Sequence, residues 1–160
     1  MTPAILKKVY KQHKIEGIIV TDLINLIYAS SATRTMHDQD LLAILAASHK
    51  NNARLDITGM LLYRGGNFLQ VLEGAEKAVD DVFNVIQQDP RHHQVALLLK
   101  RPVPKRQFER WEMGFSNLDK MDTSNLPGYT PYLNEPFNSK RFQEVSFAYA
   151  FLNMFKEEMR

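Results

Sequence analysis

The sequence predicts an α+β sandwich built from split β-α-β units, with an extra strand and a helical extension at the C-terminus. Three observations lead to this prediction. Short runs rich in β-branched and aromatic residues alternate with two stretches of helical periodicity, in the order β-α-β-β-α-β-β. A Gly-Gly pair between two of these runs indicates a tight hairpin. The length of 160 residues is enough for one domain with a short appendage. The expected fold is therefore a ferredoxin-like βαββαβ sandwich.

The first strand is expected at residues 23–30, a run of β-formers that ends in a small polar cluster. Strand alternation places Tyr28 on the same face as Ile24 and Leu26. A helix follows, with Asp38 as its N-cap. Five residues form one stripe of this helix, apolar at its start and polar at its end: Leu41, Ile44, Leu45, Ser48 and Asn52.

The next two strands form the predicted hairpin. They are expected at residues 57–63 and 67–73, and the composition of residues 64–67 is typical of the turn between them. Alternation along the second of these strands places Gln70 on the same face as Phe68.

The remaining elements of the domain follow the same reading. Gly74 leads into a second amphipathic helix, which ends at residues 89–93. Residues 94–99 are apolar enough for a central strand, and residues 111–115 alternate as a fifth strand. The basic segment 100–110 between them is expected to be a solvated loop.

Three parts of the chain are thus expected: a basic N-terminal extension at residues 1–22, the domain at residues 23–118, and a loop with a helix at residues 119–160. The first part contains four lysines and two acidic residues, which accounts for the whole net charge of +2. The apolar residues of the helix expected at 140–159 cover more than one of its faces. This helix is therefore expected to pack on the domain and on a partner.

Several classes of protein are excluded or disfavoured by the composition. The chain has no cysteine, so disulfides, thiolate metal sites and cysteine nucleophiles are excluded. The adjacent pair His92 and His93 has a poor spacing for one metal ion, so no metal site is expected. Without a membrane-spanning run or a signal peptide, the protein is expected to be cytoplasmic and to have no membrane contact. The neutral domain gives no reason to expect nucleic-acid binding.

A polar trio, Tyr28, Gln70 and Asn52, falls on faces that otherwise look buried. A buried polar group without a hydrogen bond costs about 1–3 kcal/mol, so these side chains need partners. In one interpretation Tyr28 and Gln70 bond to each other and Asn52 caps its helix. In the other, all three face a bound polar ring between the two helices.

Six segments of the chain, in order and in spacing, closely resemble the BLUF domains, which are blue-light sensors that bind flavin adenine dinucleotide. The resemblance covers about residues 23–118. Its motifs are LIYASS at 26–31, KNN at 50–52, ITGMLLY at 57–63, FLQVLEG at 68–74, DPRH at 89–92 and WEMGF at 111–115.

This resemblance implies a non-covalent FAD between the two helices, with its ring edge facing Tyr28, Gln70 and Asn52. It assigns further contacts with the flavin to residues from both helices, a strand and the loop: Ile44, Ser48, Asn51, Phe68, Asp89, Arg91 and His92. The last three would lie towards the ribityl or phosphate side. Trp111 and Met113 match the mobile pair of the family, which acts as the switch on the last strand.

The expected function is accordingly a photoreceptor, in which light rearranges a hydrogen-bond network of Tyr28, Gln70 and flavin. No effector enzyme is expected in this chain. It would signal to a partner protein of response-regulator or transcription-regulator type, or through its own assembly as a homo-oligomer. One alternative is a hydrolase similar to acylphosphatases, for which Arg34 is available but a glycine-rich phosphate cradle is not. Another is a ligand-binding regulator without flavin.

Overall fold

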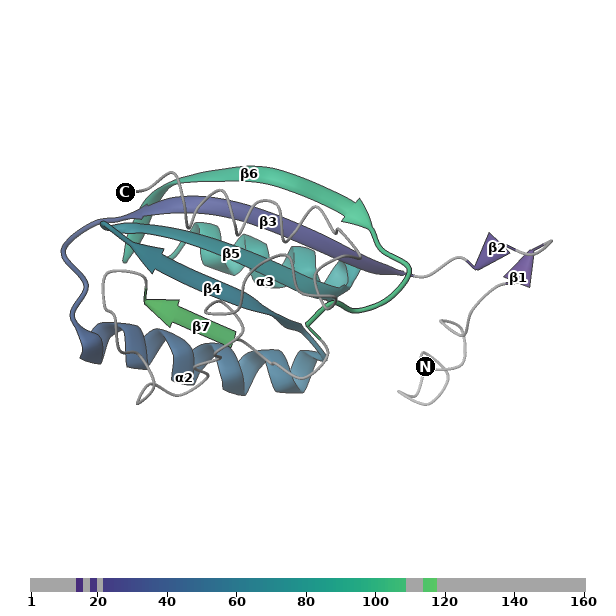
Figure 1. Ribbon diagram of the computed structural model, residues 1–160, viewed down its shortest axis with the longest axis horizontal. Coiled ribbons are helices and arrows are strands. Elements are labelled where there is room, and N and C mark those ends of the chain that lie inside the picture. The colour runs from purple at the N-terminus through teal and green to yellow at the C-terminus, as the bar shows by residue number, and fades with distance from the viewer. Residues whose placement is uncertain (1–13, 16–17, 20–21, 109–113, 118–160) are drawn as a thin grey trace, which may run out of the picture.

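The computed structural model describes residues 14–15, 18–19, 22–108 and 114–117. Figure 1 shows the arrangement of the elements. They are β1 (Lys14–Ile15), β2 (Ile18–Ile19), β3 (Leu23–Ala32), α2 (Asp38–Leu55), β4 (Thr58–Arg64), β5 (Asn67–Ala75), α3 (Glu76–Gln87), β6 (His92–Pro102) and β7 (Gly114–Asn117).

The main sheet has five strands in the order β6-β3-β5-β4-β7. Strand β7 pairs with β4 in parallel, and the other neighbours are antiparallel. Without β7 this is the βαββαβ sandwich that the sequence predicts, so the fold class and the extra strand are confirmed. Strands β1 and β2 form a separate antiparallel pair within the N-terminal extension, which the sequence analysis does not anticipate.

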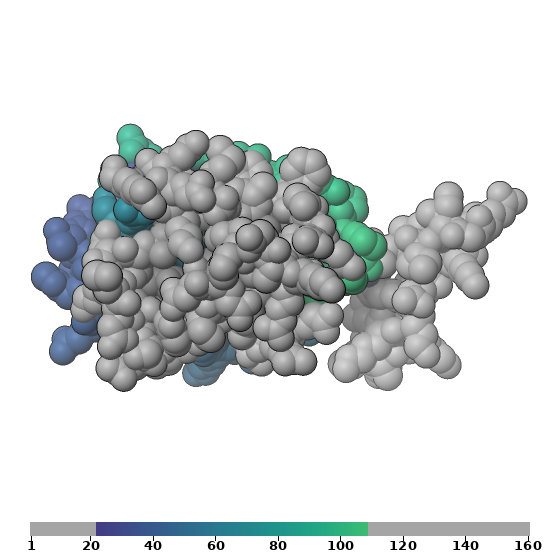
Figure 2. All heavy atoms as spheres, in the orientation of Figure 1, coloured from purple at the N-terminus to yellow at the C-terminus, as the bar shows by residue number. Residues whose placement is uncertain are grey.

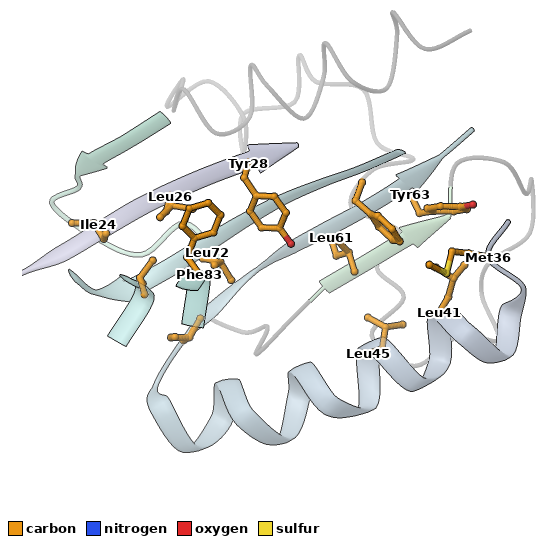
Figure 3. Close-up of a cluster of buried hydrophobic side chains, with 13 residues drawn as sticks. Ile24, Leu26, Tyr28, Met36, Leu41, Leu45, Leu61, Tyr63, Leu72 and Phe83 are labelled. Atoms are coloured by element: carbon orange, nitrogen blue, oxygen red, sulfur yellow. The ribbon is translucent and has the colours of Figure 1, made fainter. Parts of the chain in front are cut away.

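Both helices pack on the same face of the sheet. The buried cluster joins Leu26 and Tyr28 of β3 to Leu41 and Leu45 of α2, and it also includes Phe83 of α3. Figure 3 shows these side chains between the strands and α2, with the ring of Tyr28 extending from β3. Apolar burial of this kind supplies most of the stability of a domain of this size.

The hairpin between β4 and β5 turns at Gly65 and Gly66, whose φ angles are 55° and 78°. Both glycines lie in the left-handed region that a type I′ turn needs, where a residue with a Cβ atom would be strained. The predicted hairpin is confirmed.

The N-cap of the first helix is not Asp38. That residue begins α2, and His37 is the cap. The backbone N–H of His37 donates to Asp40 Oδ2 over 2.9 Å, and Arg34 Nη2 donates to Asp40 Oδ1 over 2.6 Å. The guanidinium of Arg34 lowers the pKa of Asp40 to about 2. The carboxylate of Asp40, inside the first turn, thus contributes the capping bond that was expected from Asp38.

The apolar strand near residues 94–99 is at the edge of the described sheet, not at its centre. Leu97 and Leu98 of β6 are 52% and 41% exposed. Its pairing with β3 shifts register twice, and Gln94 has a φ of 52°. Such bulges protect an edge strand from pairing with another strand. The prediction of a central strand is wrong, because apolar composition alone does not determine position in a sheet.

Other boundaries differ by a few residues. Strand β5 continues through Gly74 to Ala75, so α3 begins at Glu76. The described part of the fifth strand is Gly114–Asn117, which overlaps the predicted strand 111–115 at its last two residues. Residues 111–113 lie outside the described residues, as do the loop and helix expected at 119–160.

The basic segment is not a solvated loop. Lys100 continues β6 and forms ion pairs with Glu76 and Asp80 of α3. In the segment that follows, Val103 and Phe108 are buried. In Figure 2 the end of β6 with the segment after it (green) lies to the right of the coloured residues, and the start of α2 (blue) lies to their left.

None of the helices in the described residues is long and apolar enough to cross a membrane. The same part of the chain contains no cluster of three or more metal-ligating side chains.

Candidate functional site

A cavity of about 470 Å³ lies on the helix-covered face of the sheet, between α2 and α3. This volume is in the range typical of small-molecule sites. Its lining combines apolar side chains with a few polar groups. The residues from α2 are Ile44, Ala47, Ser48, Asn51, Asn52, Arg54 and Leu55; the strands contribute Tyr28, Leu61, Phe68, Gln70, Leu72 and His92; and α3 with the turn after it contributes Asp81, Val82, Val85, Ile86, Asp89 and Arg91.

Tyr28 and Gln70 are direct partners in the ladder between β3 and β5. Both side chains are 4% exposed, and the hydroxyl of Tyr28 donates a hydrogen bond to Gln70 Oε1. The structure thus contains the mutual bond of the first interpretation. It also places both residues on the wall of a cavity, which the second interpretation requires.

The ring of Tyr28 is held by two other rings. Its centroid lies 5.3 Å from that of Phe83 and 6.2 Å from that of His92, the latter in an edge-to-face arrangement. Burial, with a smaller contribution from the negative charge of Asp89, raises the pKa of Tyr28. Tyr28 is therefore a neutral phenol at physiological pH, with its proton directed at Gln70.

The helical repeat of α2 places several of its polar residues on the face that lines the cavity. Ile44, Ser48, Asn51 and Asn52 lie on the face that lines the cavity. Asn52 is 3% exposed. Its backbone carbonyl accepts the N–H of Ile57 at the helix end, which fixes the last turn. Asn52 thus places a buried amide in the lining near the C-terminal end of α2.

A charged turn after α3 closes another side of the cavity. Arg91 Nη2 donates to Asp89 Oδ2 over 2.5 Å, and its Nε lies 3.0 Å from both carboxylate oxygens. Hydrogen bonds from Arg91 lower the pKa of Asp89. This arrangement keeps Asp89 ionised and balances the positive charge of Arg91.

His92 connects this turn to the sheet. Its Nε2 lies 2.5 Å from the carbonyl oxygen of Ile86, and its Nδ1 lies 2.8 Å from Ser30 Oγ. A carbonyl can only accept, so Nε2 carries the proton, and in the neutral ring Nδ1 accepts from the hydroxyl of Ser30. The end of α3 is thereby fixed against β3 beside Tyr28.

All nine residues predicted to contact the cofactor line this one cavity, and so does Tyr28. Trp111 and Met113 lie outside the described residues. Several lining residues do not stand out in the sequence, among them Arg54, Val85 and Asp81. Arg54 follows Asn51 at helical spacing, so the periodicity of α2 could have identified it.

Comparisons with known proteins identify the family of the chain. The family model described as "BLUF: Sensors of blue-light using FAD" matches residues 23–114. The chain is 43% identical over 86 residues to the photoactivated adenylate cyclase subunit beta of Euglena longa, a match that covers 54% of this chain but only 10% of that protein. It is 33% identical over 96 residues to the blue light- and temperature-regulated antirepressor BluF of Escherichia coli, covering 60% of this chain and 24% of the relative.

Among solved structures, BlsA in its photo-activated state is similar with a TM-score of 0.60 and 29% identity, covering 86% of this chain and 94% of that one. The family model covers more than half of the chain, and it spans β3 to β6, the elements that build the cavity. The chain therefore belongs to the BLUF family, the sensors of blue light that use FAD.

Proposed function

We propose that this chain senses blue light through FAD bound non-covalently between α2 and α3, and that Tyr28 and Gln70 convert the absorbed light into a new hydrogen-bond pattern. The hydrogen bond from Tyr28 to Gln70 at the cavity wall is the observation that carries this proposal. The wall fits a flavin ring, because buried hydroxyl and amide groups stand beside apolar side chains such as Ile44 and Phe68.

When bound, FAD supplies the absorption of blue light and the redox chemistry. The contribution of the protein is a neutral, buried phenol that would give up an electron to the excited flavin and its proton to Gln70, and would recover both once the amide has turned, so that no net oxidation results. The proton on Tyr28 Oη already points at Gln70 Oε1, so the amide is the nearest acceptor. A half-turn of this amide exchanges its oxygen for its NH₂ group. The amide would then present its NH₂ group where Oε1 accepted from Tyr28, and its oxygen where the NH₂ group had been, and this exchange would be the signal.

The remaining lining residues are proposed to hold the cofactor. Ile44, Ser48, Asn51 and Asn52 would position the ring from α2, and Phe68 from β5. Asp89, Arg91 and His92 would lie towards the ribityl and phosphate groups. The pairing of Arg91 with Asp89 leaves this side close to neutral, so affinity should depend on hydrogen bonds rather than on a strong positive field.

The absorption spectrum of the purified protein, before and after blue light, tests the proposal directly. We expect a yellow protein whose flavin band shifts slightly to the red in light and returns in the dark. A protein that remains colourless after incubation with FAD would contradict it.

The neutral state of Tyr28 gives a pH prediction. Because its pKa in the folded protein is raised above the usual value of about 10, Tyr28 keeps its proton throughout the neutral and mildly alkaline range. The amplitude of the light-induced shift should therefore be constant from about pH 7 to about pH 10. In an unfolded chain the phenol would ionise near pH 10, so the contribution of Tyr28 to stability is complete below that pH and falls above it. Loss of the amplitude near pH 8 in protein that retains its fold and flavin would contradict a buried neutral donor.

The output of the sensor is proposed to be contact with a protein of response-regulator or transcription-regulator type, or a change in its own assembly as a homo-oligomer in the cytoplasm. The similarity to the Escherichia coli relative, a blue light- and temperature-regulated antirepressor, supports the transcriptional type. Size-exclusion chromatography in the dark and under blue light would measure the assembly.

The hydrolase alternative is not favoured. Arg34, its candidate phosphate-binding residue, donates two hydrogen bonds to Asp40 and one to the carbonyl of Thr35. It is also absent from the lining of the cavity.

A further inference from the structure

The segment after β6 crosses the sheet. Strands β6 and β7 are at opposite edges of the described sheet, so the chain between them passes from one edge to the other. Residues 103–108 are the described part of this connection. The segment starts where the N–H of Val103 donates to the carbonyl of Leu23 over 2.9 Å, and it ends at Phe108, which is 1% exposed.

Glu73, on the central strand β5, accepts hydrogen bonds from this segment. Its side chain is fully buried, and alternation along the strand places it on the face opposite Gln70. Oε2 accepts the backbone N–H of Gln107 over 2.7 Å, and Oε1 accepts that of Phe108 over 2.9 Å. A third bond, 2.8 Å long, comes from the hydroxyl of Thr58. One carboxylate thus satisfies two consecutive backbone donors of the crossing segment.

Arg106 ties the same segment to the end of the cavity helix. Its Nη2 donates to the carbonyl oxygen of Asp56 over 2.7 Å and to Asp56 Oδ2 over 2.9 Å. Its Nη1 donates to Thr58 Oγ1 over 3.0 Å and to the carbonyl oxygen of Glu73 over 3.3 Å. Asp56 is the C-cap of α2, in the left-handed conformation with a φ of 54°. Residues 106–108 are therefore bonded both to the end of α2 and to β5.

Glu73 and the photochemical pair, Tyr28 and Gln70, belong to the same ladder between β3 and β5. Tyr28 pairs with Gln70, and three residues away on both strands Asn25 pairs with Glu73. The odd separation places the two pairs on opposite faces. Asn25 Nδ2 donates to Gln107 Oε1 over 3.0 Å, while its buried Oδ1 has no hydrogen-bond partner among the described residues. Both strands that carry the light-sensitive bond thus also contact the crossing segment.

We propose that Glu73 is a positioning residue, which holds residues 106–108 against the back of the sheet and favours the dark arrangement of Tyr28 and Gln70. The proposal rests on the proposed function. Gln70 lies on β5 three residues before Glu73, so a rearrangement of Gln70 would displace the backbone of β5 near Glu73. The hydrogen bonds of Glu73 are formed with β5 in its dark-state position. They therefore oppose the light-induced state and help to drive its return. Burial raises the pKa of Glu73, an effect that the N–H groups of Gln107 and Phe108 oppose, so the carboxylate depends on these bonds.

The test uses the full chain with FAD bound and the variant Glu73→Gln. The amide keeps the size of the side chain but replaces one acceptor by a donor that faces a backbone N–H group. We expect unchanged flavin content and an unchanged dark spectrum. The amides of Gln107 and Phe108 should exchange with deuterium about tenfold faster in the dark, because a buried hydrogen bond is lost. The thermal return from the light state should be at least about threefold slower, because part of its driving force is gone.

Glu76→Gln is the matched control. Glu76 lies on α3, three residues after Glu73, and its exposed carboxylate pairs with Lys100 of β6. This substitution should change neither the exchange at residues 107 and 108 nor the rate of return. If Glu73→Gln does not fold, Thr58→Val removes the hydroxyl that bridges Glu73 and Arg106 at almost equal volume, and a slower return is again expected.

Two results would overturn the inference. Unchanged exchange in Glu73→Gln would show that Glu73 does not hold the segment. Faster exchange with an unchanged rate of return would show that the segment is held but does not act on the photochemical pair. Neither result resembles failure of the proposed function, since that would appear in the unmodified protein as a missing red shift.

Discussion

The variant Tyr28→Phe is expected to bind FAD and to lose the light-induced red shift completely. Phenylalanine fills the same space between Phe83 and His92, so the cavity keeps its shape. The substitution removes the hydroxyl that donates to Gln70, and with it the proton and the easily oxidised phenol. Gln70 then has no reason to change its orientation after illumination. Difference spectra of the purified variant before and after blue light measure this loss.

Tyr63→Phe provides the matched control. Tyr63 is also a buried tyrosine, 4% exposed, and its ring lies 4.9 Å from that of Phe68. It does not line the cavity. The shift should survive this change at full amplitude. If the shift persists in Tyr28→Phe, or disappears in both variants, Tyr28 is not the donor.

The elements of the fold could be predicted because local patterns agree with the tertiary structure. Gly65 and Gly66 mark the hairpin through a backbone requirement, and the stripe of α2 is a periodic signal. The place of β6 in the sheet is a different kind of property. An edge strand with exposed leucines has the same composition as a central one, and only the pairing partners distinguish them. The cap at His37 was also missed, because the carboxylate of Asp40 acts from inside the helix.

The site was predictable to a similar extent. Tyr28, Gln70 and Asn52 attract attention as polar residues at buried positions, and the resemblance to BLUF domains adds their roles. Arg106 did not stand out, since its segment resembles a solvated basic loop. Arg106 is held in place by hydrogen bonds to Asp56, fifty residues earlier, and to the backbone carbonyl of Glu73 on the central strand. Contacts between residues so far apart in sequence leave no local pattern.

Leu45→Ala is expected to cause the largest loss of stability among the variants considered. Leu45 is fully buried where α2 packs on the sheet, in the cluster that also contains Tyr28 and Leu61. Truncation of such a leucine typically costs about 2–5 kcal/mol, because transfer energy is lost and a void remains. The void would lie beside the helix that lines the cavity. A weaker affinity for FAD should accompany the lower stability. Urea unfolding monitored by circular dichroism, at a fixed excess of FAD, measures the first effect.

Leu42→Ala separates packing from helix propensity. Leu42 lies on the same helix, undergoes the same substitution and is only half-buried. Because less apolar surface is lost and no enclosed void forms, its cost should be well below that of Leu45→Ala. Both variants need the same concentration of free FAD, since a ligand that binds only the folded state raises apparent stability by mass action. Equal losses in the two variants would mean that the contact between α2 and the sheet at Leu45 does not limit stability, and that the cavity wall is held mainly by its other contacts.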